Sequence, residues 1–201
     1  MTLMQTLRNI RSDHMRMSRL MGIKLFPLGF LFIALTPAVV ALTLYRISHY
    51  FYVKRLRLLS WPLWLFNQYL TGADISPRSE IGESCYIGHQ AGTVISGKLG
   101  KNAMLFGGTI IGGGMGGGDV GAGEGLPVIG DNVVIGIRAV ILGPIRVGNH
   151  VNIGAGALVI KDVEDGFSML GQAATCVKIV GIDYEEIAGV AMKDRLNKPV
   201  A

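Results

Sequence analysis

Aliphatic side chains recur at every sixth residue through the middle of the chain. Stepping by six from Ile75 to Ile111, and again from Ile129 to Val159, meets an aliphatic residue at twelve of thirteen positions, with Thr93 as the exception. Glycine directly follows eight of these positions, and most repeats carry a small or β-branched residue four places on. This pattern extends over residues 75–165.

A period of six matches neither the 3.6-residue turn of a helix nor the two-residue alternation of a simple strand. It is typical of short strands joined by corners and wound into a parallel β-helix, with the aliphatic residue pointing inward and glycine where the backbone turns. Three sides of six residues make one coil, and coils stack at ~4.8 Å, so about 90 residues predict roughly five coils. A β-sandwich would show irregular turn spacing instead.

A glycine-rich segment at 112–128, GGGMGGGDVGAGEGLPV, interrupts the repeat. It contains no repeat of the aliphatic and small residues, so we expect a loop that projects from the β-helix. It lacks the Gly-Lys-Ser/Thr ending of a phosphate-binding P-loop. Two interpretations stay open: a loop that flanks a substrate, or a flexible lid or spacer.

The N-terminal quarter is apolar and basic. Leu25–Tyr45 is a run of 21 residues without a charge, and residues 1–24 place arginines among apolar residues at helical spacing, as in a basic amphipathic helix on anionic lipid. We expect residues 1–70 to be a membrane-associated helical region, bent at Pro37, re-entrant or monotopic, with both ends on the cytoplasmic side. A single crossing and a buried helical cap of a soluble oligomer are the alternatives.

Charge and composition narrow the function classes. Residues 1–57 hold nine Lys/Arg and one acid, whereas 58–201 hold ten Lys/Arg and thirteen acids, so a uniformly basic nucleic-acid binder is excluded. Half the chain is hydrophobic, which excludes a disordered protein. Cys85 and Cys176 are too few for a disulfide scaffold and are interpreted as reduced thiols. Residues 71–181 are the expected β-helix domain and 182–201 a short C-terminal helix.

Several stretches resemble one family. They are LYRISHYFYVKR (44–55), GADISPRSEIG (72–82), YIGHQAGTVI (86–95), the segment 129–163 and the turn GQAA. They resemble the hexapeptide-repeat acyltransferases, and most of all the serine O-acetyltransferase branch and its polysaccharide-modifying relatives. The resemblance implies a mainly β, left-handed parallel β-helix, a homotrimer, acetyl-CoA as acyl donor and no metal.

The resemblance also implies site residues. His89 matches the catalytic histidine, which acts as general base on an acceptor hydroxyl, and Asp74 matches the aspartate that orients it. His150 lies at a similar corner position without a family match, and it is interpreted as structural. His14 and His49, on the N-terminal helices, are interpreted in the same way.

Coenzyme A in this family lies between two β-helices and is bound largely by backbone groups. The matching positions are Gly113, Ile137 and Ala155, and Lys161 or Lys178 is expected to meet the phosphates of the coenzyme by charge.

Two departures from the serine enzymes affect the acceptor. Gly88 replaces an aspartate before the catalytic histidine, and Gly125-Leu126 replaces an Arg-His pair. We therefore expect acetyl transfer to a sugar hydroxyl of a cell-surface polysaccharide or glycolipid precursor, lipid-linked or nucleotide-linked, at the cytoplasmic face of the plasma membrane. Serine acetylation and a non-enzymatic β-helix scaffold are the alternatives. A γ-type carbonic anhydrase would need three zinc-binding histidines, and only His89 and His150 fall on the repeat.

Overall fold

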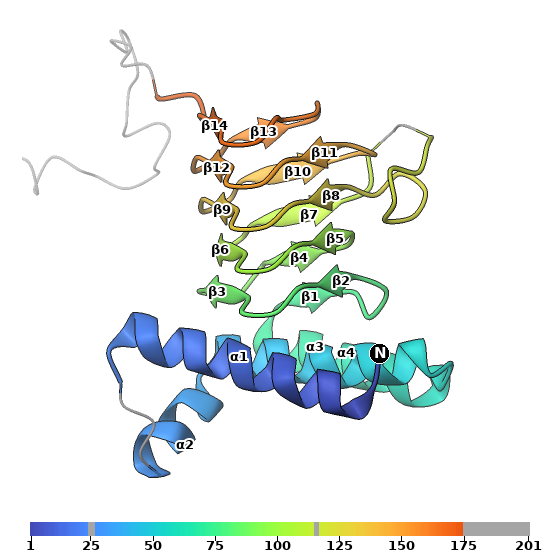
Figure 1. Ribbon diagram of the computed structural model, residues 1–201, viewed down its shortest axis with the longest axis vertical. Helices are drawn as coiled ribbons and strands as arrows, with labels where there is room; N and C mark the ends of the chain where they lie inside the picture. The colour runs from blue at the N-terminus through green and yellow to red at the C-terminus, as the bar shows by residue number, and fades with distance from the viewer. Residues whose placement is uncertain (24–26, 115–116, 175–201) are drawn as a thin grey trace, which may run out of the picture.

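A three-sided parallel β-helix stands on a layer of helices in the computed structural model, which describes residues 1–23, 27–114 and 117–174 (Figure 1). Sheet A contains β1 (Asp74–Ile75), β4 (Val94–Ile95), β7 (Ile110–Gly112), β10 (Val140–Leu142) and β13 (Leu158–Val159). Sheet B contains β2 (Glu80–Ile81), β5 (Lys98–Leu99), β8 (Val128–Ile129) and β11 (Arg146–Val147). Sheet C contains β3 (Tyr86–Gly88), β6 (Met104–Phe106), β9 (Val134–Ile135), β12 (Asn152–Ile153) and β14 (Ser168–Met169).

The aliphatic repeat forms the core of this β-helix. Successive coils pair in parallel, so each inward residue stacks on its counterpart one coil below. Ile75, Ile95, Ile111, Ile141 and Val159 form the column of sheet A, and each is almost completely buried. Fully burying one such side chain contributes roughly 1.5–3 kcal/mol, so the column and its two equivalents hold the coils together. The predicted parallel, left-handed hexapeptide β-helix is confirmed.

One position of the predicted repeat is wrong. Counting by six puts Thr93 in the aliphatic column, but the structure places Ile95 there, paired with Ile75 and Ile111. The step from Ile87 to Ile95 is eight residues, and the next step, to Leu99, is four. The corner between β3 and β4 is therefore two residues longer than its counterparts, and the following corner is two residues shorter.

The helices at the lower end of the β-helix are α1 (Leu3–Met21), α2 (Pro27–Leu35), α3 (Pro37–Val53) and α4 (Arg57–Thr71), of which α1, α3 and α4 contact its strands. The uncharged run at 25–45 is divided between two of them, because the chain bends by 75° between α2 and α3, where Thr36 precedes Pro37. A proline at the first turn starts a helix readily but cannot continue the preceding one. No single helix in the described ranges is long and apolar enough to cross a membrane, whereas the bent pair of α2 and α3 has the length and composition only when taken together.

α3 packs its inward face against the first coil of the β-helix. Its inward side chains are buried, and Ala41, Leu42 and Tyr45 belong to the same core cluster as the first coil. The alternative of a buried helical cap therefore describes α3, although it does not describe α2, which exposes most of its apolar side chains.

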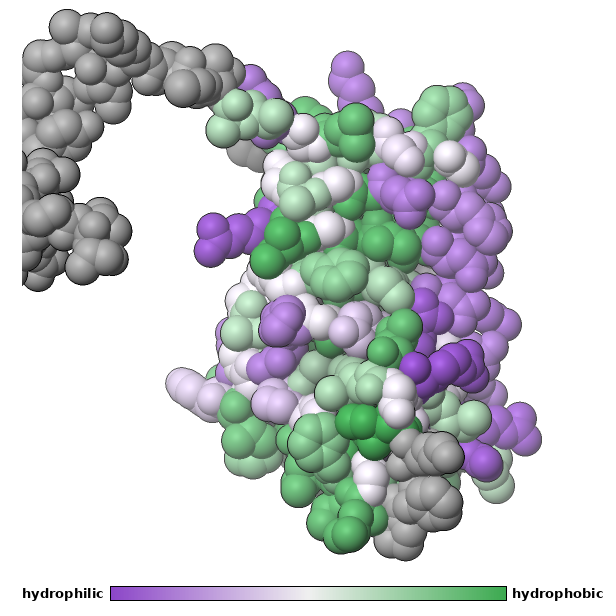
Figure 2. Space-filling view, turned by 90° about the vertical axis from the view of Figure 1, so that its left-hand side faces the viewer, coloured by the Kyte–Doolittle hydropathy of each residue, from purple (hydrophilic) through white to green (hydrophobic). Residues whose placement is uncertain are grey.

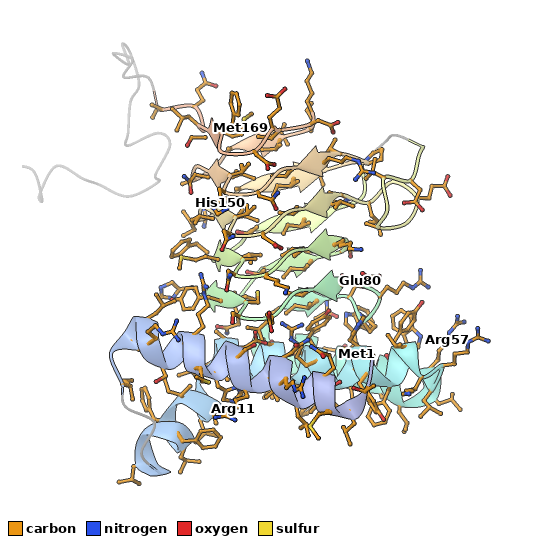
Figure 3. All side chains as sticks on the ribbon, viewed as in Figure 1. Met1, Arg11, Arg57, Glu80, His150 and Met169 are labelled. Carbon is orange, nitrogen blue, oxygen red and sulfur yellow. The ribbon has the colours of Figure 1, made fainter. Side chains whose placement is uncertain are left out.

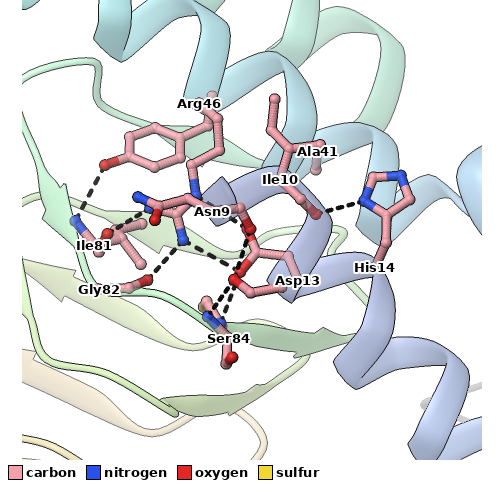
Figure 4. Close-up of polar contacts among 12 residues, drawn as sticks. Asn9, Ile10, Asp13, His14, Ala41, Arg46, Ile81, Gly82 and Ser84 are labelled. Carbon is pink, nitrogen blue, oxygen red and sulfur yellow. Dashed lines mark hydrogen bonds and ion pairs between the residues drawn. The ribbon is translucent and has the colours of Figure 1, made fainter. Parts of the chain in front are cut away.

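A buried ion pair ties α1 and α3 to the first coil (Figure 4). Arg46 Nε donates to Asp13 Oδ2 at 3.0 Å, and the same guanidinium donates to the backbone oxygens of Ile81 and Gly82. Asp13 Oδ1 accepts a hydrogen bond from the backbone N–H of Cys85 at 2.9 Å. Because the lowest coil has no further coil beneath it, these charged groups satisfy backbone atoms that a missing strand would otherwise pair.

The two predicted thiols and the predicted tail fall in different parts of the chain. Cys85 is a free, buried thiol in the core, and its burial raises its pKa to about 12. Cys176, Lys178 and the predicted helix at 182–201 lie outside the described residues.

Candidate functional site

One edge of the β-helix, where the chain passes from sheet C to sheet A, gathers three of the predicted site residues. The strand registers align His89, Gly107, Ile137 and Ala155 in a single column, one residue from each coil. His89, Ile137 and Ala155 are exposed. The coils are spaced ~4.8 Å apart, so His89, the predicted base, lies about 10 Å below Ile137, the lower of the two predicted coenzyme-binding residues in this column.

His89 occupies the long corner that the repeat does not predict. It follows β3 directly and has φ +60°, a left-handed conformation in which histidine is enriched over most side chains. In the three coils above, the left-handed residue of this corner is Gly108, Arg138 or Gly156, one register position later. The backbone at His89 is thus particular to its own coil.

The backbone conformation of His150, in contrast to that of His89, recurs from coil to coil. Its φ of +56° repeats that of Ser84, Asn102 and Asn132 at the corner between sheets B and C. A conformation shared by these coils is explained by the fold alone. The structural interpretation of His150 therefore agrees with its position.

Gly107 lies directly above His89 and leaves the histidine its space. A Cβ on Gly107 would lie 2.6 Å from the His89 carbonyl oxygen and 3.0 Å from the His89 Cβ. Such contacts are closer than van der Waals packing permits, so any side chain at 107 would displace the histidine corner. Glycine is required here by the close approach of two backbones rather than by its own φ.

Asp74 lies on β1, at the start of the lowest coil, and His89 lies at the end of the same coil, at the same edge of the β-helix. Asp74 Oδ1 accepts a hydrogen bond of 2.8 Å from Trp64 Nε1 of α4. In the described part of the chain no hydrogen bond joins Asp74 to His89. Around them, Gln90 Nε2 donates to the Thr71 carbonyl oxygen at 3.0 Å and the Gly92 N–H donates to the Gly72 carbonyl oxygen at 2.8 Å, which anchors the long corner on the turn before β1.

Trp64 is a site residue that sequence reasoning misses. It packs edge-to-face on Trp61, with ring centroids 5.4 Å apart, and points its N–H at Asp74. Helical spacing alone gives no signal for this contact, although a buried indole N–H normally finds an acceptor. The tendency of an indole N–H to find an acceptor is the one signal in the sequence that could have suggested a hydrogen bond from Trp64.

The surroundings of Gly88 are aromatic rather than acidic. A Cβ at this buried position would lie 3.1 Å from the Tyr86 hydroxyl and 3.3 Å from the Phe106 ring. These two rings pack edge-to-face with centroids 6.3 Å apart. The space that a larger residue at position 88 would need is therefore already filled by these two aromatic side chains.

Gly113 and Lys161 lie on the other border of sheet A, where the chain turns toward sheet B. Register pairs Leu142 with Gly112 and Ile141 with Val159, so Gly113 and Lys161 flank Gly143 in one column. The predicted coenzyme-binding residues thus divide between the two borders of sheet A. Its outward residues form an apolar stripe above Asp74: Val94, Ile110, Val140 and Leu158.

The glycine-rich loop leaves the β-helix between β7 and β8 and projects beside sheets A and B (Figure 1). Within it, Asp119 Oδ1 accepts hydrogen bonds from the backbone N–H groups of Gly121, Ala122 and Gly123 at 2.7–3.1 Å. These bonds lower the pKa of the Asp119 carboxyl. Asp119 is therefore occupied in shaping its own turn.

The remaining histidines have structural partners. His49 Nδ1 lies 2.9 Å from the Pro77 carbonyl oxygen and His14 Nδ1 lies 2.8 Å from that of Ile10. Across the described residues, no group of three His, Cys, Asp or Glu side chains is arranged to hold a metal ion.

Comparison with known proteins places these features in a family. The family model "Bacterial transferase hexapeptide (six repeats)" matches residues 127–161. The chain is 36% identical to a serine acetyltransferase of Mycobacterium tuberculosis over 137 residues, which are 67% of this chain and 58% of that protein. It is 32% identical to a serine acetyltransferase of Helicobacter pylori over 147 residues, 71% of this chain and 82% of that protein.

Solved structures agree. The crystal structure of Neisseria gonorrhoeae serine acetyltransferase in complex with serine matches with a TM-score of 0.73 at 28% identity, covering 86% of this chain and 69% of that one. The chain spans only 58% and 64% of the length of the Mycobacterium tuberculosis and Synechococcus elongatus relatives. The six-residue repeat, the β-helix and the 32% identity over 82% of the Helicobacter pylori protein together show the family. The chain belongs to the hexapeptide-repeat acyltransferases of the serine acetyltransferase type.

Proposed function

We propose that the protein is an acetyl-CoA-dependent O-acetyltransferase with His89 as its general base. The main support for this proposal is the column of residues at the edge between sheets C and A. His89 lies in this column beneath Gly107, Ile137 and Ala155, and its left-handed backbone comes one register position earlier than that of the coils above. The similarity to serine acetyltransferases supports acetyl-CoA as the donor and a hydroxyl as the acceptor.

In the proposed reaction, a ring nitrogen of His89 takes the proton of the acceptor hydroxyl as its oxygen attacks the thioester carbonyl. A C–O bond forms, the tetrahedral intermediate collapses, and the C–S bond breaks. The proton passes from the imidazolium to the departing sulfur, so the products are an acetyl ester and free coenzyme A. General base catalysis of this kind contributes typically ~10²–10⁴-fold to the rate.

The proposal gives Asp74 the role of orienting and charge-balancing the imidazolium. Trp64 fixes one carboxylate oxygen, Oδ1, and the other oxygen accepts no hydrogen bond from the described residues. A carboxylate that is held through one oxygen presents the other oxygen in a defined direction. In Ser-His-Asp catalytic triads, an oriented carboxylate of this kind stabilises the positively charged histidine.

Sheet A is the proposed face of a homotrimer groove. Its outward stripe is apolar, whereas the outward residues of sheet B include the ion pair of Lys98 with Glu80 at 3.2 Å. A neighbouring β-helix against this stripe would place the coenzyme between the two borders that carry Ile137, Ala155, Gly113 and Lys161. The pantetheine arm of the coenzyme, when bound by backbone groups on an open face, needs the neighbouring β-helix to exclude water.

L-Serine is the acceptor that the comparisons favour, because relatives that match over two thirds or more of the chain are serine acetyltransferases. One observation favours a neutral sugar hydroxyl, lipid-linked or free, as a second candidate. The rings of Tyr86 and Phe106 surround Gly88, the residue before His89, and Gly88 supplies no carboxylate that could pair with the ammonium group of an amino acid.

Release of the coenzyme A thiol from acetyl-CoA tests both parts. We expect turnover with either L-serine or a panel of neutral monosaccharides, and the acceptor that supports it identifies the substrate class. His89→Ala should lower kcat by at least ~10²-fold with little change in KM for acetyl-CoA. His150→Ala, the matched control, should keep kcat. Equal turnover by wild type and His89→Ala would contradict the assigned base, and absence of acetyl-CoA binding would favour a scaffold.

A further inference from the structure

We propose that α1 and α2 form a docking surface for an anionic lipid bilayer, on which the protein lies without crossing it. The inference is independent of the acetyl transfer chemistry. It rests on an uncovered apolar helix, on the sign of the exposed charges of the helical layer, and on a hollow between the two helices.

α2 is an apolar helix whose side chains are largely uncovered. It carries no charge, and five of its nine residues are large apolar side chains exposed to solvent: Leu28, Phe30, Leu31, Phe32 and Leu35. Within residues 28–35, Ile33 is the one buried side chain, and it lies in a small cluster with Met17, Ala38 and Val39. We call the five exposed residues the α2 patch. Figure 2 shows hydrophobic side chains gathered at the end of the molecule farthest from the β-helix, where Figure 1 places α2.

The exposed charges of the helical layer are of one sign. The only acid of residues 1–57 is Asp13, and it is buried against Arg46. The exposed charged side chains that the structure describes in this layer are therefore all basic: Arg8, Arg11, Arg19, Lys54, Arg55 and Arg57. Phospholipid headgroups with net negative charge complement this surface, and basic residues close to an apolar insertion add to its attraction for such membranes.

A hollow of about 420 Å³ joins the patch to α1. Leu7, Ile10 and Met15 of α1 line it together with Phe30 of α2, and Arg11 and His14 complete its walls. The His14 ring stacks on Phe30 with centroids 5.9 Å apart. Arg11 projects from α1 on the side where α2 lies (Figure 3). An apolar hollow with a cationic wall matches a lipid, whose chain is apolar and whose headgroup is negative.

The geometry suits a helix lying in the membrane interface. The 75° bend between α2 and α3 turns α2 away from the buried cap, and α2, at nine residues, is far too short to span a bilayer. An amphipathic or apolar helix of this length buries its side chains at the boundary of headgroups and acyl chains. The β-helix, including His89 on its lowest coil, would stand above the membrane surface.

Cosedimentation of the full chain with vesicles tests the proposal. The protein should sediment with vesicles that contain phosphatidylglycerol and should stay in the supernatant with phosphatidylcholine alone. Leu28→Ser/Leu35→Ser should weaken partitioning at least ~100-fold, because two leucine side chains no longer enter the apolar part of the bilayer. These residues are 83% and 66% exposed, so their loss leaves the core intact.

The matched control is Phe167→Ser/Leu170→Ser, two exposed apolar residues beside β14 at the other end of the β-helix, which should leave vesicle binding unchanged. Arg8→Glu/Arg11→Glu tests the charge independently and should abolish the preference for phosphatidylglycerol. The proposal is overturned if wild type does not sediment with either vesicle. It is equally overturned if Leu28→Ser/Leu35→Ser binds vesicles normally but dissociates an oligomer in light scattering, since the patch would then cover a second copy of the chain.

Discussion

Gly107 provides a test of the site that changes no group of the proposed chemistry. In Gly107→Ala the new Cβ would lie 2.6 Å from the His89 carbonyl oxygen, whereas ordinary contacts begin at 3.4 Å. Relief of this overlap requires a shift of about 0.8 Å, and a misplacement of ~1 Å at a reacting group costs ~10²-fold in rate. We therefore expect kcat to fall roughly 10- to 100-fold, with KM for acetyl-CoA little changed.

The same substitution should cost about 1–3 kcal/mol of stability through overpacking, so activity and stability need to be separated. Gly166→Ala serves as the control, because Gly166 has φ +76° and a Cβ added there would meet no atom within 4 Å. It should lose about 1 kcal/mol from backbone strain without moving His89. Steady-state thiol release and thermal melting of both variants make the comparison. Wild-type kcat in a folded Gly107→Ala protein would refute the claim that this column positions the base.

Two further predictions concern the helical layer. Arg46→Met leaves the Asp13 carboxylate buried without its partner and should cost about 3–5 kcal/mol in urea unfolding. Asp13→Leu/Arg46→Met should recover only part of that loss, because it removes the unpaired charge but leaves the backbone groups that the pair served without partners. A single variant as stable as wild type would contradict the role of the pair. Burial lowers the pKa of His49 below 6.5, so the neutral ring contributes stability above about pH 6.5 that is lost as pH falls toward the folded-state pKa. The melting temperature of wild type should therefore fall more steeply below pH 6.5 than that of His49→Gln, and parallel curves would exclude this contribution.

The repeat makes the β-helix predictable because its signal is local and occurs many times. Each inward aliphatic residue fills the same narrow interior, so a count by six finds the columns without any knowledge of distant contacts. The count fails at one corner, where Thr93 and Ile95 both suit an inward position. Only the stacking of Ile95 between Ile75 and Ile111 distinguishes them, and that information is not local.

The contacts that surround the candidate site are not predictable for the same reason. Trp64 and Asp74 are ten residues apart on different elements, and their hydrogen bond depends on how α4 packs beneath β1. The need for glycine at 107 arises from a backbone 18 residues away, at His89. In the N-terminal region, hydropathy finds the apolar run, but the division at Pro37 into a buried α3 and an exposed α2 depends on tertiary packing.

In the proposed reaction, His89 meets the thioester at the edge between sheets C and A. A crystal structure of the protein with coenzyme A tests it directly. We expect the pantetheine arm to lie along sheet A, with its sulfur about 3–4 Å from a ring nitrogen of His89. Coenzyme A bound against sheet B, or with its sulfur beyond the reach of His89, would contradict it.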